Sequence, residues 1–337
     1  MTRSHPLTVS EDVARSPVTR RDLDSRTIAR PPQAALAYQP HAAPVPRPTS
    51  PPGDGTTNAA LLRVAGTTIA RASRTFALGA RLLPQPERDL VRLLYFALRT
   101  LDDLVDERDP RAAERLAQAR AWLAGAAPST PETHALAAVA AERPLPRAAL
   151  AMFLDGLEYD LAGAAPSDEA ALDLYCLRVA GSVGILVAAI LDAPAHARAR
   201  AAALGSALQL VNIASDLDED LAAGRDYLGC GRRAPASRKA SSLRRSVLAP
   251  PLERARALFA FGYDGIPALR RGRFGVAVAA LAYLAIADAI ERSDYAPGRA
   301  RTSPLTKAAC VARAAFDLSF GRLSPLRRRS RRPAWPC

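Results

Sequence analysis

Several residue types are scarce in this chain of 337 residues, and each scarcity argues against a class of protein. Its four cysteines (Cys176, Cys230, Cys310 and Cys337) form no Cys-x-x-Cys pair, and its histidines are not paired either. A disulfide framework and a zinc site are therefore not indicated, and a reducing cytoplasm fits. Aromatic residues make up only 5% of the chain, and no strand-like alternation of apolar and polar residues stands out. This scarcity favours helices over sheets and predicts an all-α fold.

Long apolar runs are lacking as well. The first 30 residues have no apolar core of a signal peptide. The longer apolar runs, at 183–191 and 274–287, do not reach the roughly 18 residues that a membrane-spanning helix needs. We therefore expect a cytoplasmic protein that is at most peripheral to a membrane.

The chain is instead rich in alanine, leucine and positive charge. Hydrophobic residues make up 49% of it, enough for one large domain or two smaller ones. The formal net charge is +13, and much of the excess lies near the ends, as in the arginine-rich run 327–332. A basic protein can attract nucleic acid, anionic lipid or phosphorylated substrates. The basic end fits either a disordered tail or weak attraction to an anionic membrane surface, and nucleic acid is not expected.

The pattern divides the chain into a central domain and two tails. Residues 1–58 hold ten of the 28 prolines and show no sustained periodicity, so we expect a disordered Pro-rich tail. Residues 59–322 form the predicted domain, and 323–337 a basic disordered C-terminal tail. The sequence leaves the oligomeric state open.

A cluster of three acids, Asp102, Asp103 and Asp106, lies in an otherwise apolar run between Pro86 and Pro110. On a helix these acids share one face with Tyr95 and Arg99, beside an apolar stripe. Carboxylates on one helical face repel one another, and a hard cation such as Mg²⁺ would remove the repulsion.

A second oxygen-rich cluster follows about 110 residues later and comprises Gln209, Asn212, Asp216, Glu219 and Asp220. Three of its members are spaced i, i+4 and i+8, so the cluster occupies one face of a predicted helix. Because Mg²⁺ is usually held by one or two carboxylates plus substrate phosphates, two such faces across a cavity would suit a diphosphate substrate. Two solvated surface helices are the alternative, but both stretches lack the lysines that normally interleave with acids on such faces.

The remaining pattern predicts helices with short breaks between them. Besides the helix of the first cluster, they are expected at about 58–83, 111–125, 131–142, 146–163, 168–192, 194–223, 248–264, 274–294 and 304–321. Gly181 and Gly184 lie inside the apolar stretch 168–192, where they indicate either close helix packing or a groove for a hydrocarbon. The polar, basic segment 229–246 is expected to be a loop, with a lid over an anionic substrate as one reading.

Several ordered motifs resemble those of the squalene/phytoene synthase family, the head-to-head branch of the trans-isoprenyl diphosphate synthases, and most closely bacterial phytoene synthases. The resemblance spans about residues 65–320. In chain order the motifs are Ser73-x-Thr75-Phe76, Arg99-x-x-Asp102-Asp103-x-x-Asp106, Tyr175-Cys-x-x-Val-Ala-Gly-x-Val-Gly184, Gln209-x-x-Asn212-Ile-x-x-Asp216-x-x-Glu219-Asp220, Gly224-Arg225-x-Tyr227-Leu228 and Asp288-Ala-Ile-Glu-x-x-Asp-Tyr295.

The resemblance implies an isoprenoid-synthase helical bundle around a central cavity, and it implies roles for individual residues. The implied ligands of Mg²⁺, or alternatively Mn²⁺, are Asp102, Asp103, Asp106, Asn212, Asp216, Glu219 and Asp220. The implied catalytic set is Asp102, Asp106, Asp216, Asp220, Tyr95 and Arg99. The implied substrate-binding set is Ser73, Arg74, Thr75, Phe76, Tyr175, Val179, Ala180, Val183, Gly184, Gln209, Arg225 and Tyr227.

The implied reaction is the head-to-head condensation of two prenyl diphosphates. Two geranylgeranyl diphosphates would give phytoene, for carotenoid biosynthesis, through a cyclopropyl diphosphate intermediate. A squalene or hydroxysqualene synthase acting on farnesyl diphosphate is the alternative, and NADPH is implied only for the squalene type.

One departure from the family pattern is Ser215, which stands where the family usually has arginine. It raises the alternatives of compensation by another arginine, such as Arg178, and of a diverged terpene synthase acting on one substrate. A non-catalytic basic helical adaptor is the hypothesis from a different class, but it leaves both acidic clusters unexplained.

Overall fold

Every regular element in the described part of the chain is a helix. The computed structural model describes residue 45 and residues 55–72, 74–231 and 241–320. The longer helices are α2 (Gly55–Ala72), α3 (Arg74–Arg81), α4 (Glu87–Asp106), α5 (Ala112–Leu123), α6 (Pro131–Glu142), α7 (Arg147–Leu161), α8 (Glu169–Cys176), α9 (Ser182–Ile190), α10 (Arg198–Ser215), α11 (Leu217–Ala222), α12 (Ser241–Tyr263), α13 (Arg273–Arg292) and α14 (Pro304–Ser319). The short turns are η1 (Leu177–Gly181), η2 (Ala195–Ala197) and η5 (Ile266–Ala268). The all-α prediction is confirmed.

Local capping explains why several helices begin where the sequence pattern predicts. Thr130 accepts a hydrogen bond from the Thr133 N–H and caps α6, whose first residue is proline. Asp168 caps α8 by accepting from the Ala171 N–H at 2.8 Å. Ser303 does the same for α14 through the Thr306 N–H at 3.1 Å.

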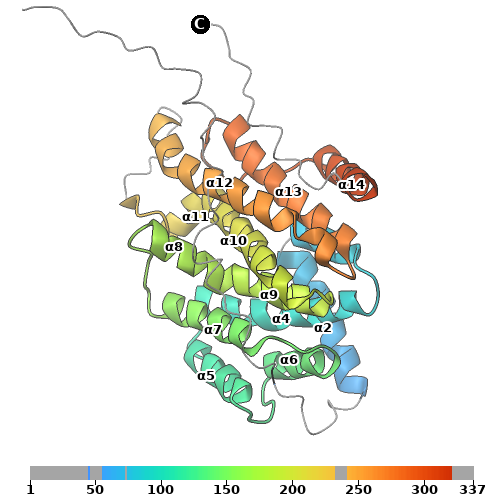
Figure 1. Ribbon diagram of the computed structural model, residues 1–337. Helices are drawn as coiled ribbons and strands as arrows, with labels where there is room; N and C mark the ends of the chain where they lie inside the picture. Colours follow the sequence, from blue (N-terminus) through green and yellow to red (C-terminus); the bar gives the residue numbers. More distant parts are fainter. Residues whose placement is uncertain (1–44, 46–54, 73, 232–240, 321–337) are drawn as a thin grey trace, which may run out of the picture. The chain divides into compact units, whose positions relative to one another are not determined.

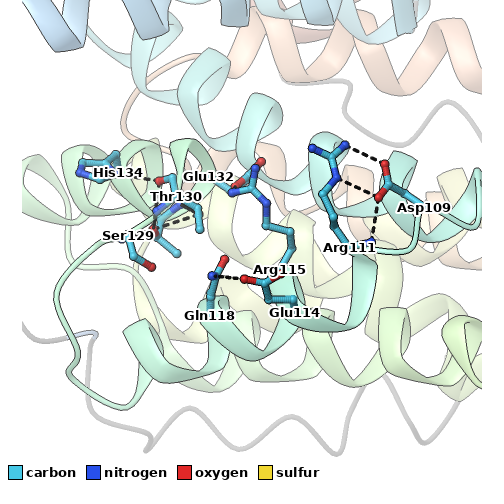
Figure 2. A network of polar contacts seen from close by, with 10 residues as sticks. Asp109, Arg111, Glu114, Arg115, Gln118, Ser129, Thr130, Glu132 and His134 are labelled. Atoms are coloured by element: carbon cyan, nitrogen blue, oxygen red, sulfur yellow. Dashed lines mark hydrogen bonds and ion pairs between the residues drawn. The ribbon is translucent and has the colours of Figure 1, made fainter.

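Figure 2 shows how side chains around the α6 start join it to the preceding helix. Arg115 on α5 pairs with the nearly buried Glu132 on α6 at 3.2 Å. Arg111, just before α5, bonds Asp109 with both its backbone N–H and its guanidinium. These contacts fix the turn after α4 and the position of α5 against α6.

Helix α10 lies between α9 and α12, and it packs on both (Figure 1). A central helix with neighbours on both sides needs small residues, and α10 carries a run of them that are fully buried, such as Ala202, Ala203 and Ala207. Helix α4 is similarly enclosed by α2, α6 and α7. The two helices that carry the acidic clusters are therefore core elements, not surface helices.

Glycines allow the closest approach of α10 to its neighbours. A Cβ added at Gly184 on α9 would lie 2.2 Å from the Ala201 carbonyl oxygen of α10, and one added at Gly205 would lie 2.2 Å from the Ala180 oxygen. Both distances are far below van der Waals contact, so only glycine fits. Of the two readings offered for the glycines of 168–192, close helix packing is confirmed, while Gly184 also faces the cavity described below.

Four predicted boundaries differ from the structure. The helix expected over 58–83 is two helices, α2 and α3, and it begins at Gly55, inside the segment predicted as a tail. The helix expected over 168–192 is interrupted by the wide π turn η1, in which the Ser182 N–H donates to the Leu177 carbonyl. Helix α12 begins at Ser241, well before its prolines, so it includes part of the segment predicted as a loop.

The fourth difference lies in the second acidic stretch, where the predicted helix 194–223 breaks at Asp216 into α10 and α11. The Asp216 backbone has φ −102° and ψ 10°, outside the helical range. The remaining part of the predicted loop, residues 232–240, and its reading as a lid lie outside the described residues.

The predicted tails fall largely outside the described residues too. One exception is Val45, which is buried and whose N–H donates to the Leu145 carbonyl at 2.9 Å. This one residue of the region predicted as tail therefore packs on the helical domain. The basic segment 323–337 is not described.

Two stretches have the length and apolar composition of a membrane-crossing helix, Glu169–Ile190 and α13. Half of each is buried inside the protein, as in core helices of a folded domain. Neither stretch was predicted as long enough, because the prediction used uninterrupted apolar runs and each stretch is longer than the run it contains.

The close contacts of α10 predict a clear difference between two glycine substitutions. Gly205→Ala places a methyl group against a backbone oxygen that cannot move without shifting η1, so we expect a loss of about 1–3 kcal/mol or more. Gly66→Ala on α2 meets nothing within 4 Å and should gain roughly 1 kcal/mol from helix propensity. Thermal and denaturant unfolding of the two variants check this, and a Gly205→Ala protein as stable as the parent would contradict the packing.

Candidate active site

One cavity of about 540 Å³ lies among α4, α9, α10 and α13. It brings together most of the residues predicted from the sequence. These are Phe76, Tyr95, Arg99, Asp102, Asp106, Tyr175, Val179, Ala180, Val183, Gly184, Gln209, Asn212, Asp216, Glu219, Asp220, Arg225 and Tyr227. The acids gather toward one end, and apolar residues such as Leu94, Leu191 and Leu269 line the rest.

The two acidic clusters face each other across the polar end of this cavity. Arg225, which follows α11, contacts both walls: its Nη1 lies 3.5 Å from Oδ1 of Asp106 on α4, and its Nη2 lies 3.1 Å from Oδ1 of Asp220 on α11. One guanidinium can span both contacts only if the carboxylates are close neighbours. The predicted convergence of acids separated by about 110 residues is therefore present in the structure.

Burial and mutual repulsion act on the first cluster. Burial, followed by the negative charge of Asp106, raises the pKa of Asp102 to about 7 even though Arg99 opposes the shift. Arg99 pairs with Asp102 at 2.8 Å and with Asp103 at 2.5 Å. Asp103, predicted as a metal ligand, does not line the cavity and is held by Arg99 at its edge.

The second cluster is arranged around the helix break at Asp216. The Asp216 N–H still donates to the Asn212 carbonyl at 2.8 Å, and the Asp220 N–H donates to the Asp216 carbonyl at 2.9 Å, so the break keeps both acids on the cavity side. Burial raises the pKa of Asp216 and brings that of Asp220 to about 6. The Oδ1 atom of Asp216 is buried and accepts no well-formed hydrogen bond, although an arginine lies beside it. A buried carboxylate oxygen whose charge is met only by an ion pair fits a position for a cation.

An arginine that the sequence analysis missed lies beside Asp216. Arg299, in the segment between α13 and α14, places its Nε 3.1 Å from Asp216 Oδ1 and its Nη1 3.8 Å from Glu219. It lines the cavity, whereas Arg178 does not. Of the two arginines, Arg299 is therefore the one that lies beside the second acidic cluster. No motif marks Arg299 in the sequence, because it stands alone in a loop.

A group of tyrosines surrounds a second missed residue, Asp160 on α7. The Tyr175 hydroxyl donates to Asp160 at 2.9 Å, and the Tyr175 and Tyr227 rings stack with centroids 5.0 Å apart. Burial raises the pKa of Asp160 to about 6. Across the cavity, Tyr95 stacks on Phe76 at 5.1 Å. Asp160 gave no sequence signal because no acid follows it at helical spacing.

The first predicted phosphate-binding element is only partly described. Ser73 and the side chain of Arg74 lie outside the described residues, Thr75 does not line the cavity, and Phe76 does.

The carboxylate and amide oxygens of the cavity fit a hard cation that also takes ligands from a substrate. Among the described residues no three acidic, histidine or cysteine side chains converge on one point. Arginines hold the carboxylates instead, through Arg99, Arg225 and Arg299. One or two carboxylates per wall match Mg²⁺, which takes its remaining ligands from water and phosphate. The residues that could hold it are Asp102, Asp106, Asn212, Asp216, Glu219 and Asp220.

A comparison with protein families assigns this chain to a known group of enzymes. The model described as squalene/phytoene synthase matches residues 69–307. The chain belongs to the squalene/phytoene synthase family. It is thus an enzyme, a prenyltransferase from a family that condenses prenyl diphosphates head-to-head, and the adaptor hypothesis is wrong.

Individual members of the squalene/phytoene synthase family are similar to this chain in sequence and in structure. The phytoene synthase of Thermus thermophilus is 34% identical, over 70% of this chain and 84% of that protein. The presqualene diphosphate synthase of Rhodopseudomonas palustris is 36% identical, over 55% of this chain and 72% of that protein. A crystal structure of a dehydrosqualene synthase superposes with a TM-score of 0.70 at 23% identity, over 79% of this chain and 99% of that one. The predicted fold family is thereby confirmed.

Repulsion within the first cluster predicts a gain in stability when one charge is removed. Because the folded pKa of Asp102 is raised, its charged form opposes folding, and stability falls as pH rises from about 4, the ordinary pKa of an aspartate, to about 7, and is level above that. We expect metal-free Asp102→Asn to melt roughly 2–4 °C higher than the parent at pH 8, the shift that about 1 kcal/mol produces in a domain of this size. The same variant should lose the stabilisation that Mg²⁺ with inorganic pyrophosphate gives the parent.

The matched control for this variant is Asp109→Asn, just beyond α4. Hydrogen bonds from Arg111 lower the pKa of Asp109 to about 2, so its charge favours folding and its removal should lower the melting temperature. Scanning calorimetry at pH 8 measures both variants. An Asp102→Asn protein that melts below the parent would contradict the repulsion.

The position of Arg299 predicts a role in holding diphosphate. A hydrogen bond to a charged group contributes about 1.5–3 kcal/mol, so Arg299→Gln should weaken binding of Mg²⁺-pyrophosphate by roughly 10- to 100-fold. Arg178→Gln, outside the cavity lining, is the control and should bind as the parent does. Titration calorimetry measures the dissociation constants, and parent-like affinity in Arg299→Gln would exclude this role.

Proposed function

We propose that the protein condenses two geranylgeranyl diphosphates head-to-head to phytoene in a Mg²⁺-dependent reaction that passes through a cyclopropyl diphosphate. The observation that carries the proposal is the bridge from Asp106 through Arg225 to Asp220. It brings the two acidic walls together at one end of a cavity whose remainder is apolar. That combination suits an amphiphile with a diphosphate head and a long hydrocarbon chain.

The residues at the polar end of the cavity and those along its apolar part have different roles in this proposal. Arg99, Arg225 and Arg299 offer guanidiniums that can turn from the carboxylates to substrate phosphates. Mg²⁺, held by the freed carboxylates, would neutralise the departing pyrophosphate. The tyrosine rings at 175 and 227 and the apolar wall from Val179 to Gly184 exclude water from the carbocation that remains.

Cavity length supports a long substrate. On α4 the lining extends from Asp106 to Val91, fifteen residue steps or roughly 22 Å of helix. It also extends from Ala201 on α10 to Asp216, which directly follows that helix, an equal number of steps. The similarity to the phytoene synthase of Thermus thermophilus, which extends over 84% of that protein, also supports the C20 substrate.

The second candidate is a squalene-type enzyme that acts on farnesyl diphosphate. The presqualene diphosphate synthase relative favours it, since its identity to this chain is similar. Only in that case would NADPH be needed, to reduce the intermediate to squalene. The position of Arg299 beside Asp216 weakens the argument from Ser215 for a single-substrate terpene synthase. A cytoplasmic location, which the sequence predicts, is part of the proposal.

Purified protein incubated with Mg²⁺ and each of the C10, C15 and C20 prenyl diphosphates tests the proposal. We expect pyrophosphate release fastest with the C20 substrate, and a linear C40 hydrocarbon in the extract, without NADPH. Mn²⁺ should replace Mg²⁺ at least in part, and chelation should stop the reaction. A C30 product from the C15 substrate alone would establish the squalene-type candidate, and no pyrophosphate from any substrate would contradict both.

A further inference from the structure

A buried arginine joins three segments that surround the second acidic cluster. Arg244, in the first turn of α12, is only 2% exposed. Its two terminal nitrogens donate to the two carboxylate oxygens of Asp218 on α11, at 2.7 and 3.1 Å. Its Nε donates to the Tyr295 carbonyl, in the segment between α13 and α14, at 2.9 Å. We call Arg244 and Asp218 the α11–α12 clamp.

The clamp also holds the segment between α13 and α14 at a second point. Oδ2 of Asp218 accepts a hydrogen bond from the Gly298 N–H at 2.8 Å. Gly298 has a φ of +94°, a backbone conformation that favours glycine. The next residue is Arg299, whose guanidinium pairs with Asp216 and Glu219. The clamp therefore fixes the backbone from which Arg299 reaches the cavity.

The clamp itself lies outside the cavity. Asp216, Glu219 and Asp220 line the cavity, whereas Asp218 and Arg244 do not. The short helix α11 thus directs acids to two sides, toward the cavity and toward the start of α12. Any influence of the clamp on the cavity must pass through the residues that it positions.

The location of Arg244 is unfavourable unless its contacts have a use. The helix dipole disfavours a positive charge near the start of a helix, and the first turn of α12 has no acidic residue. Burying a guanidinium is costly unless its charge is paired and its donors are satisfied. The bidentate contact with Asp218 and the bond to the Tyr295 carbonyl meet both conditions.

The segment that the clamp holds has an unusual backbone. Asp294 and Tyr295 have φ values of 54° and 58°, in the left-handed region that residues with a side chain rarely adopt. Such a backbone persists where surrounding contacts fix it, and it is concentrated at functional sites. Arg245, which follows Arg244, pairs with Asp294. Its Cζ lies 5.6 Å from the centre of the Tyr295 ring, so two consecutive arginines of α12 hold this turn.

We propose that Arg244 and Asp218 are positioning residues, and that their clamp sets where the Arg299 guanidinium meets the diphosphate group of the substrate. This inference rests on the proposed function, in which the acidic end of the cavity binds Mg²⁺ and diphosphate. It does not depend on the length of the prenyl chain. A residue in a loop needs such support, because no helix of its own fixes its direction.

A double-mutant cycle on the binding of Mg²⁺ with inorganic pyrophosphate tests the positioning role. Asp218→Asn keeps the shape of the side chain but removes its charge and one acceptor oxygen. In the parent background we expect it to weaken binding roughly 5- to 20-fold, within the range of measured couplings between contacting residues. In the Arg299→Gln background the same substitution should change the dissociation constant less than about twofold, since the residue that the clamp positions is absent.

The cycle separates positioning from two simpler effects. Loss of the Asp218 charge changes the electrostatic field at the nearby acidic cluster, but it does so in both backgrounds. A general loosening of the fold also lowers the affinity in both. Only an effect that passes through Arg299 disappears when Arg299 is replaced.

Arg244→Lys is a second variant, and it leaves the net charge unchanged. Lysine lacks the fork of donors that contacts Asp218 and the Tyr295 carbonyl together. We expect the same dependence on Arg299 as for Asp218→Asn. If this buried substitution prevents folding, Asp218→Asn decides alone, because 32% of the Asp218 side chain is exposed and asparagine should fit there.

The matched control is Asp173→Asn on α8. Its carboxylate also pairs with an arginine of α12, Arg254, and neither residue lines the cavity. This variant should bind Mg²⁺ with pyrophosphate as the parent does, in both backgrounds. Melting temperatures show that each variant is folded.

Titration calorimetry of these variants gives three kinds of result. Weaker binding in the parent background alone supports the positioning role. Parent-like binding in Asp218→Asn, or equal weakening in both backgrounds, would overturn that role while the proposed function stands. A parent protein that binds no pyrophosphate in the presence of Mg²⁺ would overturn both.

Discussion

Repulsion between carboxylates that are forced together at the end of an apolar cavity is the constraint on which the rest of the structure depends. Asp102, Asp106, Asp216 and Asp220 come from two core helices and the short helix α11, and burial raises the pKa of three of them toward neutrality. Arginines that reach in from the sides offset part of the repulsion. The arrangement is costly for folding, which is typical of sites where binding and not stability determines the residues.

The surrounding helices must provide the stability that the acidic end does not. They do so by packing α10 closely enough that a single methyl group at Gly205 or Gly184 would overlap a backbone oxygen. The same close packing leaves the inner faces of α9 and α10 free to line a long apolar cavity. Close packing also favours a fixed separation of the two acidic clusters, so in the proposed reaction a cation and a diphosphate would meet an arrangement that is already formed.

Periodicity allowed the acidic clusters to be found from the sequence, since a helix places acids at i, i+4 and i+8 on one face. It could not show that these faces meet, because that depends on packing between helices far apart in the chain; the lack of interleaving lysines and the family resemblance indicated it. Arg299 and Asp160 were missed because a single residue in a loop, or one without a periodic partner, carries no pattern. The break at Asp216 was missed because the residues on both sides are good helix formers, so local propensity predicts a continuous helix. Arg178 was offered as one arginine that could compensate for Ser215, but the sequence alone does not determine which arginine lines the cavity.

In the proposed function, the two acidic walls bind one metal–diphosphate unit between them. Crystals of the protein soaked with Mn²⁺ and inorganic pyrophosphate, measured at the manganese absorption edge, test this most directly. We expect anomalous peaks inside the cavity, with ligands from Asp102 or Asp106 on one wall, from Asp216 or Asp220 on the other, and pyrophosphate between them. Manganese bound to one wall only, with pyrophosphate elsewhere or absent, would contradict it.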